Sequence, residues 1–389
     1  MTRAGPFQAF FSERFFSCFL RSALLALVVA SAALAQQTPA GFDAVATSAA
    51  AARDNNDVLR AIQLYTQAEQ LNPGWASGWW SLGLLQYSSK AWSEARIAFT
   101  HYIELSPEGS AAAAQAIALR GLCEFETGNF HQSLADLQQS LALGATQDAG
   151  SAMLIRLREA QLLTRLGRFE EALDVYGSLA KAGPPNQRSP EWNIGVGLAG
   201  LRSSQLPADV PVGQQILFAM AGDAALRFMS GDQAGAKQVF SNLFQRFPES
   251  ANAHYLYGSL LSPTDPDAAI VEYKQELAVA PTNVTVAAML ARVLLYQAQP
   301  AQALPFAQRA ASEDPESPLA QLVLGRSLAE TGDLSAGIEH LQKALELQPG
   351  YLETHIALAG AYASAGRPQD ARRERLQSLE MAETYRAQQ

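Results

Sequence analysis

Residues 318–351, PLAQLVLGRSLAETGDLSAGIEHLQKALELQPGY, carry the pattern that decides the fold. Apolar residues recur at helical spacing in each half of this stretch, for example Leu324 and Leu328 in the first half and Ile338 and Leu341 in the second. Such spacing places one apolar stripe along each of two short helices. The stretch therefore predicts a pair of amphipathic helices joined by a turn.

The residues between and after the two helices support this prediction. Gly332 favours the left-handed conformation that ends a helix, and Asp333 is suited to cap the next one. Pro349 prevents the second helix from continuing. Small residues at Gly325 and Gly337 allow the two helix backbones to approach closely.

A 34-residue helix pair with small residues at fixed places and a closing proline resembles a tetratricopeptide repeat. The resemblance implies an all-α fold, a superhelical solenoid of about nine helix pairs. The second helix of the last repeat, RRERLQSLEMAETYR, is charged, as expected for a solenoid cap. The expected repeats cover residues 42–75, 76–109, 114–147, 153–186, 217–250, 251–283, 284–317, 318–351 and 352–385.

The repeat phase breaks over residues 187–216, which contain several prolines. We expect an irregular connector there, with one short helix over Trp192–Leu201. It would separate an N-terminal array of about four repeats, residues 42–186, from a C-terminal array of about five, residues 217–389.

Residues 1–35 have the layout of a secretory signal peptide. Three arginines lie in the first 21 residues, and the uncharged run 22–35 ends in Ala-Leu-Ala. At about 14 residues the run is short for a bilayer span. We expect cleavage after Ala35, a short linker over 36–41, and an exported protein, periplasmic or extracellular. The alternative is an uncleaved N-terminal membrane anchor.

Composition argues against two further classes of protein. The net charge is −9, whereas a nucleic-acid-binding surface requires clustered Lys and Arg. Of the two cysteines, Cys18 lies in the segment expected to be removed, so no internal disulfide is expected. Cys123 lies among apolar residues, which favours a buried small side chain over a reactive thiol.

Residues 195–200 spell G-x-G-x-x-G, the dinucleotide-binding pattern. That motif functions between a buried strand and a helix, and no apolar strand precedes it here. We interpret the glycines as sites where helices cross closely. The five histidines do not occur at metal-ligand spacing, and no hydrolase or phosphate-loop motif occurs. We therefore expect no catalytic residue, no metal and no cofactor.

The tetratricopeptide resemblance implies a concave face lined by the first helix of each repeat, which holds a peptide or protein segment. Carrying that phase along the chain gives ten candidate groove residues, each of which could instead serve packing. They are Trp80, Tyr87, Arg158, Gln161, Arg165, Asn252, Tyr255, Arg292, Tyr296 and Arg326.

Arg292 and Arg326 lie 34 residues apart, and stacking should bring both onto one wall. There they would bind an acidic or C-terminal segment, unless Glu330 or another neighbour neutralises them. The Lys/Asn arrangement with which some relatives bind a terminal carboxylate is absent from the matching positions.

The sequence thus predicts a non-enzymatic interaction scaffold with a protein or peptide partner from the cell envelope and no nucleic acid. Membrane contact is expected only if the N-terminal segment stays uncleaved. The alternatives are an assembly factor for an envelope machine, and a nucleotide-binding or enzyme accessory built on residues 187–216.

Overall fold

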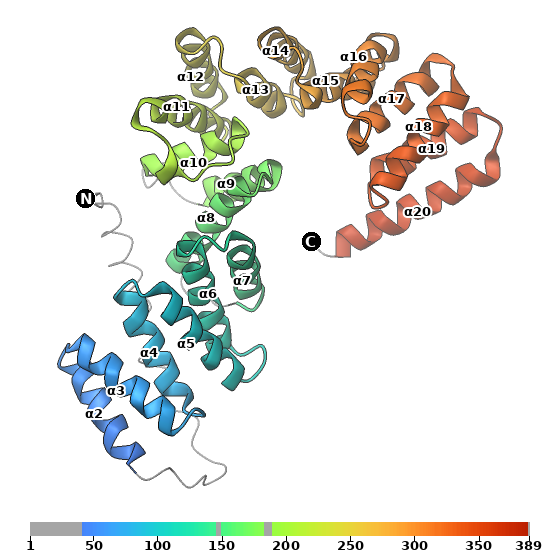
Figure 1. Cartoon of the computed structure of the whole chain (residues 1–389). Coiled ribbons are helices and arrows are strands. Elements are labelled where there is room, and N and C mark those ends of the chain that lie inside the picture. Colours follow the sequence, from blue (N-terminus) through green and yellow to red (C-terminus); the bar gives the residue numbers. More distant parts are fainter. Residues whose placement is uncertain (1–40, 145–148, 183–188, 388–389) are drawn as a thin grey trace. The chain divides into compact units, whose positions relative to one another are not determined.

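The computed structural model describes residues 41–144, 149–182 and 189–387. These residues form 19 α-helices and a 3-10 turn and contain no strand, which confirms the all-α fold (Figure 1). In chain order the α-helices are α2 (Phe42–Asp54), α3 (Val58–Leu71), α4 (Ala76–Ser88), α5 (Trp92–Leu105), α6 (Ala111–Glu126), α7 (Phe130–Ala142), α8 (Ala149–Arg165), α9 (Phe169–Ala182), α10 (Pro190–Gly200), α11 (Val212–Met229), α12 (Gln233–Arg246), α13 (Ala253–Leu261), α14 (Pro266–Val279), α15 (Val284–Tyr296), α16 (Pro300–Glu313), α17 (Pro318–Thr331), α18 (Leu334–Leu347), α19 (Leu352–Ser364) and α20 (Pro368–Ala387).

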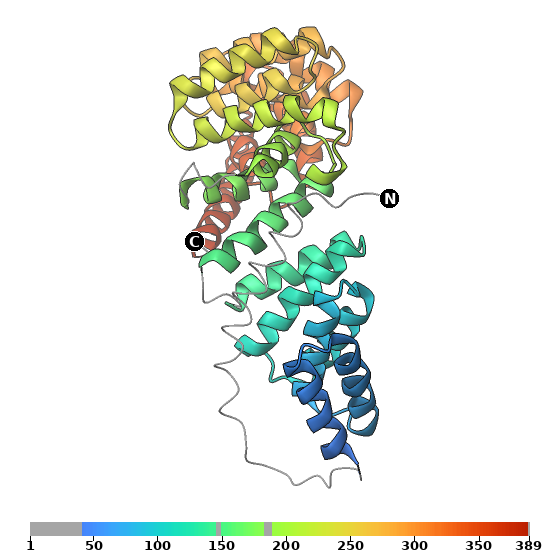
Figure 2. The same ribbon diagram turned by 90° about the vertical axis from the view of Figure 1, so that its left-hand side faces the viewer.

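The chain divides into two compact units. The N-terminal unit consists of Met1–Ala199 and Ser203–Val210, and the C-terminal unit of Gly200–Arg202 and Pro211–Gln389. Within each unit the two helices of a repeat pack as an antiparallel pair, and consecutive repeats pack on each other (Figure 1 and Figure 2). Each expected repeat corresponds to one helix pair, from α2–α3 to α19–α20, with α10 as an additional helix.

The α17–α18 pair has the local geometry that its sequence predicts. Gly332 ends α17 with φ of 109°, and the Asp333 side chain caps α18 by accepting a hydrogen bond from the Ala336 N–H. A Cβ atom added to Gly325 would lie 2.7 Å from the Gly337 carbonyl oxygen. The close approach of the two backbones therefore requires glycine at this crossing.

One position of the second helix anchors the core in eight of the nine repeats. Its side chain is apolar or aromatic and no more than 1% exposed. In four repeats this side chain packs directly on a glycine of the first helix of the same pair, at Gly83, Gly121, Gly258 and Gly325. The residues at this position are Tyr65, Phe99, Leu137, Tyr176, Phe240, Tyr273, Ala307 and Leu341. The ninth repeat has the exposed Arg375 there, as expected for a cap.

Between the two arrays the chain forms α10 over the stretch where a short helix was expected. Trp192 anchors it and is 2% exposed. A 3-10 turn, Pro207–Asp209, follows, and α11 begins at Val212 directly after Pro211. The prolines thus lie at the beginnings of elements, where their missing N–H and fixed φ are tolerated.

The predicted signal peptide, residues 1–35, and its alternative as an anchor lie outside the described residues, as does Cys18. Export therefore stays a prediction. Among the helices that the structure describes, none combines the length and the apolar character needed to cross a bilayer.

Candidate functional site

The aromatic candidates of the N-terminal unit are packed against other rings. The Trp80 ring centroid lies 5.1 Å from that of Tyr102 and 5.9 Å from that of Phe99. The Tyr87 ring lies 5.0 Å from Trp92. Burial raises the pKa of the Tyr87 hydroxyl above its usual range. Both side chains belong to the partly buried shell of a core cluster, where they contribute packing.

The polar candidates of the N-terminal unit form an internal chain. The Arg158 guanidinium stacks on the Phe125 ring, 3.8 Å from its centroid, and donates a 2.8 Å hydrogen bond to Gln161. Burial lowers the pKa of Arg158. Gln161 in turn donates to Glu191 at 3.4 Å, and Arg165 donates to the Ser204 carbonyl at 3.0 Å. These groups join α8 to α10 and to the segment after it.

In the C-terminal unit, Asn252 holds the beginning of α13. It adopts a left-handed φ of 66°, and its N–H donates to Glu276 at 2.6 Å. Its side-chain amide donates to the Leu201 carbonyl at 3.2 Å and accepts from Asn283 at 3.0 Å. All of its polar groups thus have partners within the protein. Asn252 is a positioning residue of the fold.

Tyr255 is also occupied by neighbours. It is 7% exposed, and the Arg202 guanidinium lies 5.5 Å from its ring centroid and 3.4 Å from its hydroxyl. The structure therefore places Tyr255 in a packed contact, whereas Tyr296 on α15 is 63% exposed.

The structure does bring Arg292, Tyr296 and Arg326 together, from the first helices α15 and α17. Arg326 lies 5.4 Å from the Tyr296 ring centroid. It also pairs with Glu330 at 3.2 Å and with Glu353 at 3.1 Å. The pairing of Arg326 with Glu330, the alternative raised from the sequence, is therefore confirmed, and Glu353 adds a second carboxylate.

Arg292 has a different environment. Its hydrogen bond is a long one, 3.5 Å to the Tyr351 hydroxyl, and no carboxylate of the described residues pairs with it within 4.0 Å. Burial, and then the neighbouring Glu353, raise the pKa of Tyr351, whose hydroxyl lies 3.5 Å from a Glu353 carboxyl oxygen. Burial opposes the Arg292 charge, while Tyr351 and Glu353 favour it without a direct ion pair.

Arg292 and Tyr296 border a hollow of about 430 Å³. Its opposite side is formed by the turn between α13 and α14, at Ser262, Pro263 and Pro266. An unpaired guanidinium beside an exposed phenol ring is suited to a carboxylate together with a flat group.

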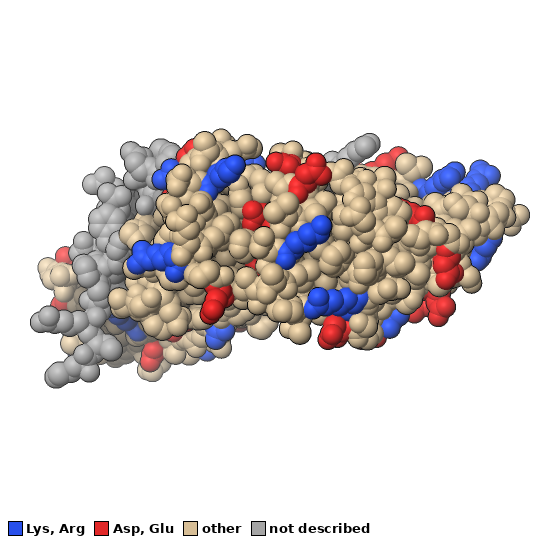
Figure 3. Space-filling model, turned by 90° about the horizontal axis from the view of Figure 1, so that it is seen from above, with Lys and Arg blue, Asp and Glu red and all other residues tan. Residues whose placement is uncertain are grey.

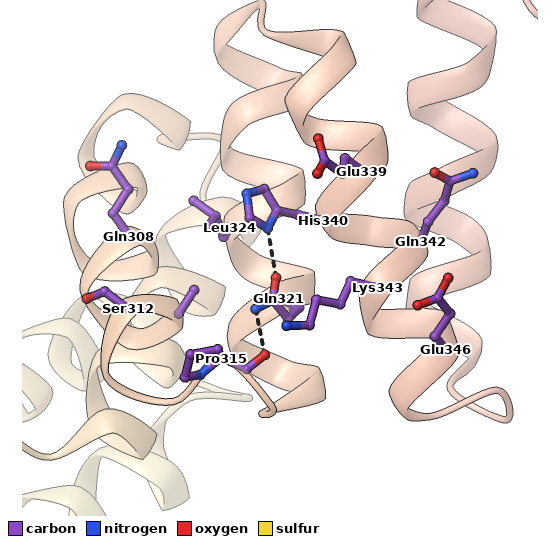
Figure 4. Close-up of a pocket in the computed structure, with 11 residues that line it drawn as sticks. Gln308, Ser312, Pro315, Gln321, Leu324, Glu339, His340, Gln342, Lys343 and Glu346 are labelled. Carbon is purple, nitrogen blue, oxygen red and sulfur yellow. Dashed lines mark hydrogen bonds between the residues drawn. The ribbon is translucent and has the colours of Figure 1, made fainter.

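A larger hollow of about 640 Å³ lies between α16, α17 and α18, and sequence reasoning did not find it (Figure 4). The Gln321 amide donates to the Pro315 carbonyl at 2.8 Å and accepts from His340 Nδ1 at 2.7 Å. No motif signals the site, because its residues come from three helices.

The glycines of the G-x-G-x-x-G pattern lie in α10. A Cβ on Gly195 would be 2.4 Å from the Tyr176 hydroxyl oxygen, and one on Gly200 would be 2.6 Å from a Leu256 methyl. These are helix-packing glycines, as we interpreted them.

Elsewhere in the described ranges, Cys123 is buried, which raises the pKa of its thiol to about 12, as expected for a small core residue.

Charged side chains are interspersed on the face drawn in Figure 3. Its basic and acidic groups alternate, and uncharged atoms cover most of the described surface in that view. No group of three His, Cys, Asp or Glu side chains among the described residues is placed to hold a metal ion.

Two tetratricopeptide repeat profiles match the chain. One matches residues 47–110, 119–187, 157–225 and 288–351, and the other residues 328–382. Together they cover more than half of the sequence. No curated protein matches.

Solved structures that resemble the chain include MamA 41-end from Desulfovibrio magneticus RS-1. It is 20% identical with a TM-score of 0.39, and the match covers 43% of this chain and 96% of that one. A second, YrrB, is titled a TPR protein with an unusual peptide-binding site. It is 21% identical with a TM-score of 0.36, and the match covers 42% of this chain and 84% of YrrB. At these scores the likeness says nothing about function.

Proposed function

Because this chain belongs to the tetratricopeptide repeat family, we propose that it is an exported, non-enzymatic scaffold that holds a segment of a partner protein on its first helices. Repeats of this family generally mediate protein–protein interaction. The partner segment carries a carboxylate, from an acidic side chain or a chain terminus, and comes from a protein of the cell envelope.

The observation that carries this proposal is the hollow beside Arg292 and Tyr296. A charged, partly buried guanidinium without a carboxylate has unused hydrogen-bond donors, and an incoming carboxylate would satisfy them. The adjoining Tyr296 ring offers flat contact area with few rotatable bonds to immobilise.

Arg326 has a secondary role in this proposal. Glu330 and Glu353 already neutralise it, so a ligand would have to compete with two resident carboxylates. We therefore assign binding of the ligand's charge to Arg292, and to Arg326 the positioning of Tyr296 through their cation–π contact.

The test uses a photoreactive phenylalanine derivative at Tyr296 in cells that make the protein. A matched control carries the same group at Val271, which is 54% exposed on α14, a second helix. We expect a crosslinked partner segment at position 296, absent at 271 and lost when Arg292→Glu is added. Equal crosslinking at both positions would contradict the proposal.

The ligand chemistry is tested with the crosslinked segment made as a synthetic peptide. The peptide with its carboxylate should bind more tightly than the same peptide with that group amidated, and Arg292→Ala should remove the difference. Affinity for the carboxylate peptide should fall with added salt, because the contact is electrostatic. A preference that survives Arg292→Ala would exclude Arg292 as the binding residue.

Export is tested independently. Intact-mass analysis of protein from the envelope fraction should give the mass of a chain that begins at Gln36. A mass that includes Met1 would favour the anchored alternative.

Assembly of an envelope machine remains a form of the same proposal that differs in its partner. The nucleotide-binding or enzyme-accessory alternative, built on residues 187–216, gains no support from α10, because Gly195 and Gly200 lie at close packing contacts.

A further inference from the structure

The last described helix, α20, has two exposed leucines in a stripe along one face, although most of its residues are charged or polar. Leu376 and Leu379 are 52% and 59% exposed, and Arg372 and Glu383 are exposed beside them. The four residues follow one another at spacings of four, three and four, so they lie on one face of the helix. The face opposite, with Ala371 and Glu374, is buried.

On α14, α16 and α18 the next repeat covers the equivalent stripe only in part, because the residues at the position of Leu376, namely Lys274, Gln308 and Gln342, are polar and exposed. On α18, 34 residues earlier, Ile338 is 8% exposed, and the Gln342 amide donates a 3.0 Å hydrogen bond to the Tyr362 hydroxyl of α19. Figure 1 shows α20 as the last helix of the chain, with no described helix after it. What sets the stripe on α20 apart is that the exposed position carries leucine, so that two apolar side chains, Leu376 and Leu379, lie next to each other at the surface of the described residues.

The charged residues of this stripe indicate which kind of helix would pack on it. Arg367 and Arg373 pair with Asp370, whereas neither Arg372 nor Glu383 forms an ion pair among the described residues. The basic residue lies at one end of the stripe and the acidic residue at the other. The midpoint between residues 372 and 383 is also the midpoint between the two leucines.

The α20 helix of a second copy, packed antiparallel, would therefore place a complementary residue opposite each of these four residues. Arg372 would face Glu383 of the partner subunit, Leu376 would face Leu379 of the partner subunit, and the two-fold axis would repeat both contacts. A parallel copy would instead place like charges together. This charge complementarity selects a second copy of the chain over an unrelated helix.

We propose that α20 is a homodimer interface in which two copies pack antiparallel through Arg372, Leu376, Leu379 and Glu383. The proposal is independent of the ligand assigned to Arg292. Two leucines per copy give a small apolar contact, so dimerisation is weak and depends on concentration.

The test is sedimentation equilibrium of the purified protein over a concentration series. The wild-type protein should rise from the monomer mass towards the dimer mass. Arg372→Glu and Glu383→Arg should each weaken the dimer at least tenfold, because each places two pairs of like charges in contact. Mixed in equal amounts, the two variants should form a heterodimer of wild-type strength, since both ion pairs return. The double variant should likewise recover.

Lys274→Glu, an exposed charge reversal on α14, serves as the matched control and should dimerise as the wild type does. Circular dichroism of each variant checks that the helices are intact. Leu376→Asp should abolish the dimer at any salt concentration, while salt should weaken the wild-type dimer only in part. A monomer at all concentrations, or a mixture of the two single variants that fails to associate, would overturn the proposal. Capture of a different protein's helix by a protein that stays monomeric would overturn it as well.

Discussion

The two units of the molecule differ in what the candidate residues of their first helices do. In the N-terminal unit, Trp80 and Tyr87 pack against other aromatic rings. In the C-terminal unit, Tyr296 is exposed and Arg292 has no carboxylate partner. The difference shows that a place on a first helix does not by itself make a binding residue. A side chain is free to bind only where its neighbours, on first or second helices, supply no partner for it.

The largest effect expected from this comparison is on stability. Trp80→Ala should lower the free energy of unfolding of the N-terminal unit by about 3–5 kcal/mol, because it removes a large side chain packed on Phe99 and Tyr102. Tyr296→Ala should change it by about 0.5 kcal/mol or less, as an exposed residue does. Urea denaturation followed by circular dichroism measures both. If the two variants lost similar amounts of unfolding free energy, Trp80 and Tyr296 would not differ in their contribution to packing.

Two buried glutamates on second helices extend the comparison. In the C-terminal unit, Glu276 accepts hydrogen bonds from the backbone N–H groups of Asn252, His254 and Tyr255. In the N-terminal unit, both carboxyl oxygens of Glu69 lack a hydrogen-bond partner among the described residues. Desolvation raises the pKa of Glu69 to about 8. Replacing each of these two glutamates by glutamine should therefore affect the stability of the protein in different ways.

Glu69 should make the protein less stable as the pH rises. The unfolded chain releases this proton near the ordinary pKa of glutamate, whereas the folded protein keeps it until about pH 8. The folded state thus binds the additional proton between these values, and stability falls from pH 5 to pH 8 by on the order of 3 kcal/mol. Glu69→Gln should flatten this dependence, measured as the urea midpoint against pH.

The matched control is Glu276→Gln, which should be destabilising at neutral pH by about 1–3 kcal/mol, because three N–H groups lose their charged acceptor. If Glu69→Gln leaves the pH profile unchanged, Glu69 has a partner in solution and the contrast between the two carboxyls is wrong.

Substituting a glycine where the two helices of a repeat pack closely should have a smaller effect on stability than the changes above. A Cβ on Gly325 would meet the Gly337 carbonyl and the Leu341 N–H, both backbone groups, at 2.7 and 2.8 Å. A Cβ on Gly83, the equivalent glycine of the N-terminal unit, would meet the Phe99 ring, a side chain. Gly325→Ala should therefore cost about 1–3 kcal/mol, and Gly83→Ala less, since a ring moves more easily than a helix. Thermal unfolding of the two variants should show this order, and a reversed order would contradict it.

The repeat architecture could be read from the sequence because its signals are local. Gly332 and Asp333 act within one turn, and the apolar stripe of α18 needs no knowledge of distant residues. The role of Asn252 could not be predicted, because its partners Leu201 and Glu276 are brought to it by the tertiary fold. For the same reason the sequence placed Arg292 and Arg326 on one wall but did not show that Glu353, one repeat further on, forms a direct ion pair with Arg326 and not with Arg292.

The smallest effect concerns that ion pair. Arg326 and Glu353 are partly exposed, with side-chain exposures of 17% and 19%, and pairs of this kind contribute little because water already solvates both charges. A double-mutant cycle of Arg326→Ala and Glu353→Ala should therefore give a coupling of about 1 kcal/mol or less in urea denaturation. Glu353→Ala alone should raise the affinity of the carboxylate peptide, because it removes a negative charge beside Arg292 and one of the two carboxylates that neutralise Arg326. A coupling well above this range, together with unchanged peptide affinity in Glu353→Ala, would mean that the pair is a fixed part of the fold and that the C-terminal unit, like the N-terminal one, uses these positions for packing.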